Sequence, residues 1–253
     1  LNTICFAIGG TLGLVWAATT GRLRQLRKVR WHIYAFGTIG LFGYHALYFS
    51  ALRLAPAAQA GLIAYLWPLL IVLMSGLLPG ERLRMGHILG GLLGFGGAGL
   101  IILGGNSGLN VSALPGYAMA LACAFTWAGY SVLSRRLGAV PTETVAIFCL
   151  ASACLSGVLH LMFEPTIWPQ TSTAWAATIA LGLGPVGLAF YVWDIGVKGG
   201  DIQLLGVASY AAPLLSTLVL VLAGVAPPSW SFAISAILIT SGAALAARAS
   251  FGK

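Results

Sequence analysis

Residues 44–104 of the chain recur as residues 189–249, and each copy places a Tyr-x-x-Pro element in the middle of an apolar run. Tyr65 and Pro68 of the first copy correspond to Tyr210 and Pro213 of the second, at an offset of 145 positions. A membrane protein built from two related halves is typical of secondary transporters, which hold their substrate where the halves meet. The repeat therefore predicts transport.

The composition places the chain in a lipid bilayer. Of its residues 59% are hydrophobic and only 7% are charged, and the mean hydropathy is +0.94. So few charged groups cannot coat the surface of a soluble protein of 26.2 kDa. A membrane-spanning helix needs roughly 20 apolar residues, and nine stretches meet this need: 2–20, 33–51, 58–78, 86–104, 114–134, 142–162, 174–195, 202–224 and 228–247. They predict an all-α integral membrane protein without a soluble domain.

The basic residues predict the orientation of these spans. Every Lys and Arg except Arg53 follows the first, third, fifth, seventh or ninth of these stretches. Twelve of the 13 basic residues therefore fall on one side. Lys and Arg beside short loops stay in the cytoplasm. We therefore expect a multi-pass membrane protein with a cytoplasmic C-terminus. The net charge of +8 follows from this topology, so no nucleic-acid partner is predicted.

The repeat also predicts how the halves are arranged. The stretch 114–134 has no counterpart 145 residues earlier, so the first half (1–105) contains four stretches and the second half (106–253) contains five. We expect a further helix before residue 1 and ten helices in the complete protein. Because five is an odd number, the two five-helix halves should cross the membrane in opposite directions, as an inverted repeat.

Two prolines near the centres of their spans indicate a site at mid-membrane depth. Pro68 and Pro213 each remove one helix hydrogen bond and free a carbonyl group about one turn earlier, near Ala64 and Ser209. A simple packing kink is the alternative for either proline alone. Their equivalent positions in the repeat favour a central site in which the freed carbonyls find a partner.

Polar aromatic residues at the same depth strengthen this interpretation. A deep Tyr or Trp needs a partner for its O–H or N–H group, and an ionisable residue inside the membrane usually faces a cavity. Core packing is the alternative explanation for an aromatic stripe. The candidate binding residues are Tyr44, His45, Tyr48, Tyr65, Trp67, Trp127, Ser209 and Tyr210. Tyr44 and Tyr48 lie one helical turn apart, with His45 beside them.

Other motifs in the chain do not predict chemistry. The Gly-x-Gly-x-x-Gly matches at 94–99 and 182–187 lie inside spans, so we interpret their glycines as helix-packing residues rather than as a nucleotide site. No Walker A motif is present, so the chain itself should not hydrolyse ATP and no ATPase subunit is evident. The four cysteines also lie in spans and are interpreted as small apolar fillers. We expect no metal and no cofactor.

Three segments resemble the drug/metabolite transporter superfamily, and within it the bacterial exporters of aromatic amino acids. These segments are Gly43-Tyr-His-Ala-Leu-Tyr48, Tyr65-Leu-Trp-Pro68, and Trp193–Asp201 followed by Ser209-Tyr-Ala-Ala-Pro213. The resemblance covers essentially the whole chain. It implies ten helices in two inverted five-helix repeats, and export of amino acids through a central cavity that the eight candidate residues line.

The residue chemistry agrees with an amino-acid substrate. His45, Ser209, the tyrosine hydroxyls and the freed carbonyls could bind the charged ends of a zwitterion, while Trp67 or Trp127 could stack on an aromatic side chain. Bulky apolar walls would also accept non-aromatic amino acids. We expect a monomer that works by alternating access.

The sequence favours facilitated diffusion, because coupled carriers usually bury a carboxylate at mid-depth and no span contains one there. Asp194 lies near the cytoplasmic end of its span and is interpreted as the partner of a Lys or Arg. His45 could relay protons, but we interpret it as a hydrogen-bonding residue of the cavity. A proton-coupled multidrug exporter that binds aromatic cations by cation–π contact is the alternative. An intramembrane enzyme is less compatible, because His45 has no catalytic partner in the sequence.

Overall fold

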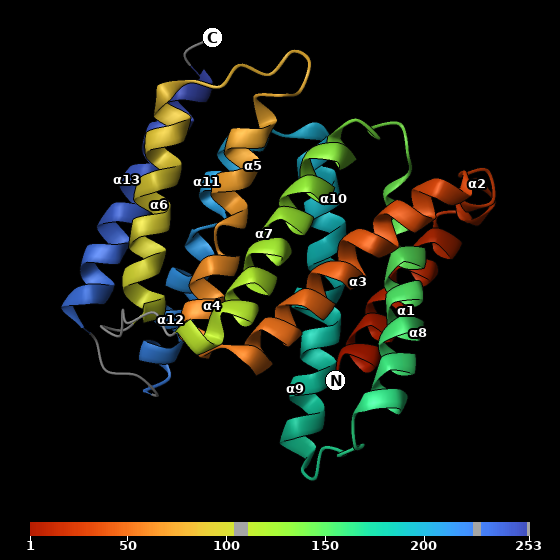
Figure 1. Ribbon diagram of the computed structural model, residues 1–253. Coiled ribbons are helices and arrows are strands. Elements are labelled where there is room, and N and C mark those ends of the chain that lie inside the picture. The colour runs from red at the N-terminus through yellow and green to blue at the C-terminus, as the bar shows by residue number, and fades with distance from the viewer. Residues whose placement is uncertain (104–110, 225–228, 252–253) are drawn as a thin grey trace. The chain divides into compact units, whose positions relative to one another are not determined.

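The computed structural model describes residues 1–103, 111–224 and 229–251 of the chain, and in these residues it contains helices and no strand (Figure 1). The helices are α1 (Asn2–Thr19), α2 (Leu23–Leu26), α3 (Trp31–Leu54), α4 (Ala57–Ala64), α5 (Trp67–Ser75), α6 (Met85–Leu103), η1 (Val111–Ala113), α7 (Leu114–Arg135), η2 (Thr142–Thr144), α8 (Val145–Phe163), α9 (Ser172–Leu183), η3 (Gly184–Leu188), α10 (Ala189–Gly199), α11 (Ile202–Ala208), α12 (Ala211–Leu222) and α13 (Trp230–Phe251). The all-α prediction is confirmed.

Among the described residues, eight helical segments are long and apolar enough to cross a bilayer, and each coincides with one of the predicted stretches. The remaining stretch, 33–51, forms α3, a continuous helix of 24 residues. At 1.5 Å per residue α3 is long enough to span the hydrocarbon core. It is less apolar than the others because it carries Tyr34, Tyr44, His45 and Tyr48. The chain is therefore a multi-pass membrane protein.

The spans that contain Pro68 and Pro213 are both broken where the sequence predicts. α4 ends at Ala64 and α5 starts at Trp67, with Pro68 in its first turn. In the second copy α11 ends at Ala208 and α12 starts at Ala211, with Pro213 in its first turn. Each break thus lies about one turn before the proline, where the ring removes the helical hydrogen bond.

A third break was not expected. The π-helical turn η3 separates α9 from α10 and contains Pro185. Its repeat equivalent, residues 39–43, lies inside the uninterrupted helix α3. Proline explains this difference, because it occurs in only one of the two copies.

The helices gather into two compact units. Unit 1 contains residues 1–46 and 133–199, and unit 2 contains residues 47–132 and 200–253. Each unit draws on both halves of the sequence. The predicted boundary between the sequence halves, at 105/106, falls outside the described residues and stays a prediction.

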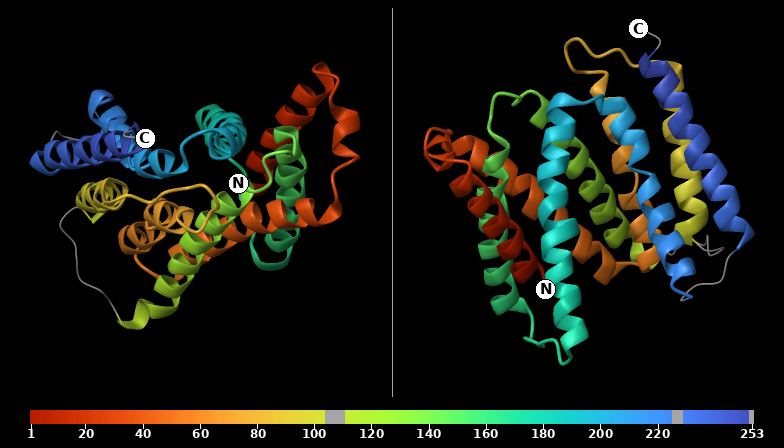
Figure 2. Two further views of the ribbon diagram at one scale, coloured as in Figure 1. Left: turned by 90° about the horizontal axis from the view of Figure 1, so that it is seen from above. Right: turned by 180° about the vertical axis from the view of Figure 1, so that it is seen from behind.

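In unit 2, α6 packs closely against α13 (Figure 2). The helix axes approach because glycines face each other: a methyl group added at Gly90 would lie 2.5 Å from the carbonyl oxygen of Gly242, and one at Gly242 would lie 2.6 Å from that of Gly90. In lipid, such close packing replaces the hydrophobic effect as the force between helices. The predicted role of Gly90 as a packing glycine is confirmed.

The same contacts show that α6 and α13 run in opposite directions. Along α6 the contacting residue numbers rise from Gly86 to Gly97, while their partners along α13 fall from Ala249 to Ser235. α6 and α13 are also repeat equivalents, because the offset of 145 carries Met85 onto Trp230. Equivalent helices that cross antiparallel are what an inverted repeat requires.

A two-fold axis between α6 and α13 requires that each contact between them has an equivalent contact related by the repeat. The offset of 145 turns the pair Gly90 and Gly242 into the pair Ser235 and Gly97. A methyl group at Gly97 would lie 3.0 Å from the carbonyl oxygen of Ser235, so this second pair is also in contact. The inverted-repeat architecture is confirmed.

In unit 1, α1 packs against α8, α9 and η3. Glycines again permit the approach, since a methyl group at Gly9 would lie 2.9 Å from the α-carbon of Gly187 in η3. The Tyr191 hydroxyl of α10 donates a hydrogen bond to the Gly9 carbonyl oxygen at 2.8 Å. Gly182 and Gly187 of the 182–187 motif thus serve packing, as predicted, whereas Gly184 has no neighbour within 4 Å of an added methyl group.

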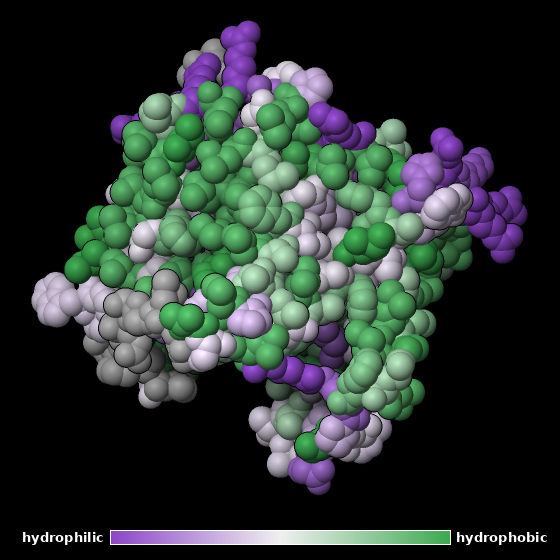
Figure 3. Space-filling model, in the orientation of Figure 1, coloured by the Kyte–Doolittle hydropathy of each residue, from purple (hydrophilic) through white to green (hydrophobic). Residues whose placement is uncertain are grey.

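The surface agrees with a membrane-embedded protein. Large apolar side chains are exposed along the lengths of the helices, for example Ile39, Leu161 and Val219. Hydrophilic residues gather at helix ends, most visibly at α2 (Figure 3). This distribution is expected where lipid, not water, covers the helix sides.

Gly90→Ala should destabilise the protein because the added methyl group overlaps the α13 backbone. We expect a loss of about 1–3 kcal/mol in unfolding free energy, measured by thermal or denaturant unfolding in detergent. Gly96→Ala is the matched control, since Gly96 lies on the same helix with no neighbour within 4 Å. Equal stability of the two variants would contradict the close crossing of α6 and α13.

Candidate functional site

A cluster of aromatic side chains in unit 2 contains two of the predicted site residues. Trp67, at the start of α5, meets Trp127 of α7 edge to face, with ring centroids 6.4 Å apart and planes at 85°. Trp127 also lies 5.3 Å from the ring of Tyr130, one turn further along α7. Trp127 and Tyr130 are buried, and Trp67 is partly exposed. Such an assembly can accept the face or edge of a further aromatic ring.

The two helix breaks bring Tyr65 and Tyr210 into one cluster. Tyr210 is buried with Ala98 and Ile239, and Tyr65 packs against this cluster from the first break. Tyr65 is partly exposed, whereas Tyr210 has no exposed surface. The two equivalent tyrosines are therefore near each other but differ in their access to a ligand.

The remaining unit 2 candidates are placed at the helix breaks or near them. The Ser209 hydroxyl donates to the Leu205 carbonyl oxygen of its own helix at 2.8 Å. Tyr48 is partly exposed on α3 and lies 5.9 Å, ring to ring, from its neighbour Phe49. A convergence of all eight candidates on a single cavity stays a prediction.

In unit 1, His45 is enclosed by aromatic rings. Its ring centroid lies 4.8 Å from that of Phe6, 5.9 Å from that of Phe190 and 5.0 Å from that of Tyr44. His45 Nδ1 lies 2.8 Å from the carbonyl oxygen of Leu41. A carbonyl oxygen only accepts, so this contact assigns a hydrogen atom to Nδ1.

The sequence did not identify several partners of the candidate residues. Phe6 and Phe190 surround His45 from helices remote in the chain, and no local pattern marks them. Tyr130 could have been found, because it lies three positions after Trp127 and therefore on the same helix face. The Tyr117 hydroxyl donates to Gln59 Oε1 at 3.1 Å, a pairing between α7 and α4 that the sequence does not indicate.

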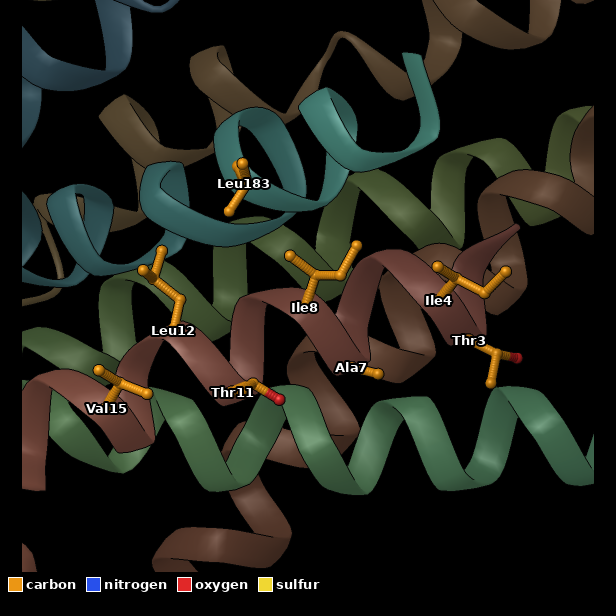
Figure 4. Close-up of a pocket in the computed structure, with 8 residues that line it drawn as sticks. All are labelled: Thr3, Ile4, Ala7, Ile8, Thr11, Leu12, Val15 and Leu183. Atoms are coloured by element: carbon orange, nitrogen blue, oxygen red, sulfur yellow. The ribbon is translucent and has the colours of Figure 1, made fainter. Parts of the chain in front are cut away.

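A groove on unit 1 offers space but not the right chemistry. Its volume is about 550 Å³, and side chains of α1 together with Leu183 line it (Figure 4). Thr3 and Thr11 are its only polar residues; the others are Ile4, Ala7, Ile8, Leu12, Val15 and Leu183. A zwitterion needs charged or strongly polar partners, so this groove does not fit an amino acid.

The acidic residues are engaged in contacts at helix ends. Asp194 Oδ2 accepts hydrogen bonds from Lys198 Nζ and from the Thr142 hydroxyl, both at 2.7 Å. The predicted pairing of Asp194 with a basic residue is confirmed. Glu143 is also buried, in η2 before α8, and forms an ion pair with Arg22 at 2.9 Å.

The other carboxylates with described contacts lie at ends of helices as well. Glu164 pairs with His160 at 2.8 Å beyond the end of α8. Asp201 caps α11 by accepting the Leu204 N–H group at 2.9 Å. Within residues 1–103, 111–224 and 229–251, no three His, Cys, Asp or Glu side chains are grouped so that they could hold a metal ion.

Asp194→Ala should destabilise the protein strongly, because it leaves the Lys198 ammonium group buried without its carboxylate. We expect a loss of about 3–5 kcal/mol in unfolding free energy, and Asp194→Leu combined with Lys198→Met should recover much of it. Glu164→Gln is the matched control, since its ion pair is partly exposed and should contribute about 1 kcal/mol or less. Similar losses for the two single variants in detergent unfolding would contradict this assignment.

Comparison with known proteins identifies relatives along the whole chain. The chain is 54% identical to the aromatic amino acid exporter YddG of Ancylobacter novellus over 97% of its own length and 86% of the relative's. It is 30% identical to the YddG exporter of Salmonella typhimurium and 27% identical to that of Escherichia coli, over 75% of this chain and 66% of each relative. These relatives are named as exporters, not enzymes.

A solved crystal structure resembles the present one with a TM-score of 0.92 and 53% identity, over 97% of this chain and 86% of the other. The model of the EamA-like transporter family matches residues 1–103 and 114–248. These regions contain both copies of the repeat except the last residue of each, and all the candidate site residues. The chain therefore belongs to the EamA-like transporter family, within the drug/metabolite transporter superfamily.

Proposed function

We propose that the protein exports neutral amino acids, aromatic ones among them, across the bacterial inner membrane. The observation that carries this proposal is the 54% identity, over 97% of the chain, to a relative named as an aromatic amino acid exporter. The aromatic cluster of Trp67, Trp127 and Tyr130 supports it, because these rings can pack against an aromatic substrate.

Polar candidates would bind the charged ends of the substrate. Tyr44, Tyr48 and Tyr65 are partly exposed and carry hydroxyl groups that can donate to a carboxylate or accept from an ammonium group. His45 on α3 and Ser209 at the end of α11 are further polar candidates. The helices that carry these candidates are rich in apolar residues, so non-aromatic amino acids should also be carried.

Unequal packing of the two repeat copies in unit 2 supports transport by alternating access. Gly206 on α11 lies against α5, where an added methyl group would come within 3.0 Å of the Pro68 carbonyl oxygen. At its equivalent, Gly61 on α4, the nearest neighbour would be Ile102 at 3.9 Å. The tight contact between α11 and α5 thus has no match at the equivalent position. In a carrier built from inverted copies, the tight packing can pass from one copy to its equivalent. The access path to the substrate then moves from one side of the membrane to the other.

The charge distribution supports an assignment of sides. α5 ends before the loop with Arg82 and Arg84, and α11 begins shortly after Lys198. The positive-inside rule assigns these residues to the cytoplasm, together with the C-terminus. The tightly packed contact between α11 and α5 in unit 2 then lies in the cytoplasmic half of the membrane.

We also propose facilitated diffusion as the driving mechanism. Asp194, Glu143, Glu164 and Asp201 are engaged at helix ends, so none offers a carboxylate at mid-depth that could load and release a proton. Glu81 lies in the loop between α5 and α6. A zwitterion without net charge moves down its own gradient without help from the membrane potential.

Trp67→Ala should lower the uptake of labelled phenylalanine into proteoliposomes by roughly fivefold, because it removes an aromatic surface worth about 1 kcal/mol. Trp230→Ala is the matched control, since Trp230 is 86% exposed at the start of α13. Equal, small effects at matched protein content would count against the aromatic site. Transport of methyl viologen in place of phenylalanine would favour the multidrug alternative.

Purified protein in liposomes should equilibrate amino acid without a pH gradient or a membrane potential. Imposing either should produce no accumulation of a zwitterionic substrate above equilibrium, although 100 mV would contribute roughly 2.3 kcal/mol per charge to a coupled carrier. Sustained uphill accumulation driven by a pH gradient would overturn the proposal of facilitated diffusion. If His45→Ala then abolished accumulation but retained downhill flux, His45 would be the proton carrier.

A further inference from the structure

A side-chain hydrogen bond links the two helix breaks of unit 2. The Leu69 N–H group, in the first turn of α5, donates to the Tyr210 hydroxyl oxygen at 3.1 Å. The first N–H groups of a helix have no acceptor within the helix, and in lipid an unsatisfied one is costly. Tyr210 belongs to the break between α11 and α12, so a residue of the second sequence half caps a helix of the first.

Tyr210 is held firmly in this position. Its side chain is fully buried, and its ring packs edge to face with Phe95 at 6.3 Å. The ring lies against the backbone of α6 at Gly94, where an added methyl group would overlap it. The absence of a side chain at Gly94 therefore creates the space that Tyr210 fills.

The equivalent tyrosine cannot copy this arrangement. The offset of 145 carries Tyr210 onto Tyr65 and Gly94 onto Ile239. The Ile239 side chain is buried and fills the space beside α13, so the Tyr65 ring cannot lie against the α13 backbone as Tyr210 lies against α6. The different packing of the two tyrosines thus follows from a sequence difference, Gly94 against Ile239, rather than from the conformation of the carrier.

We propose that Tyr210 is a positioning residue that does not contact substrate itself, while Tyr65 is the substrate-facing member of the pair. Its hydroxyl fixes the first turn of α5, and that turn carries Trp67, whose ring meets Trp127. Tyr210, a residue of the second sequence half, thereby determines the position of Trp67, an aromatic residue of the first half. This inference rests on the proposed amino-acid site and assigns separate tasks to its two equivalent tyrosines.

Tyr210→Phe tests the proposal because it removes only the hydroxyl group. Loss of one hydrogen bond to the first turn of α5 should raise the KM for phenylalanine by about fivefold, with the maximal rate nearly unchanged. A merely structural residue would instead lower the maximal rate through loss of folded protein and leave KM unchanged. In hydrogen–deuterium exchange, the peptide that contains Leu69 should exchange faster in the variant than in the wild type.

Three variants serve as comparisons. Tyr65→Phe should change KM without changing exchange at Leu69. Gly94→Ala should reproduce both effects of Tyr210→Phe by displacing the ring, and Gly96→Ala, on an open face of α6, should reproduce neither. Unchanged exchange at Leu69 in Tyr210→Phe, or an equal change in Tyr65→Phe, would overturn the proposal. Hydrogen–deuterium exchange needs no substrate. If the wild type transported no amino acid but Tyr210→Phe still exchanged faster at Leu69, the proposed function would be refuted, while the hydrogen bond from Leu69 to Tyr210 would be supported.

Discussion

The need to satisfy every backbone N–H and C=O group inside lipid governs this structure. Continuous helices meet that need within themselves, and a break is tolerated only where another group completes the hydrogen bonds. The breaks before Pro68 and Pro213 therefore require neighbours, and one such neighbour is the Tyr210 hydroxyl on the Leu69 N–H group. The missing side chain at Gly94 of α6 brings this neighbour within reach, because it leaves the space that the Tyr210 ring occupies.

Features that repeat or have a period could be predicted from the sequence. The apolar stretches predicted the spans because a membrane helix needs about 20 apolar residues, and the offset of 145 with an odd number of helices predicted the inversion seen between α6 and α13. The two proline breaks followed from the chemistry of proline. Asp194 was correctly paired with a basic residue because Lys198 lies one helical turn away.

Contacts between distant segments could not be predicted in the same way. Phe6 and Phe190 enclose His45, but each sits in an apolar helix where one more phenylalanine carries no signal. The break at η3 was missed because Pro185 was interpreted only as part of a glycine motif. Tyr65 and Tyr210 were treated as equal because the repeat aligns them, and their difference depends on Gly94 and Ile239, residues of other helices.

The departures from symmetry carry as much functional meaning as the symmetry itself. An inverted repeat gives a carrier two related packings, so that one end can close as the other opens. A binding site must nevertheless hold a substrate whose two ends differ, and a strictly two-fold site would present the same groups twice. In the proposed division of roles, the change from Gly94 to Ile239 between the repeat copies gives Tyr210 a structural role and leaves Tyr65 to face the substrate. Sequence divergence between the two halves can thus build an asymmetric site on a scaffold of symmetry-related helices.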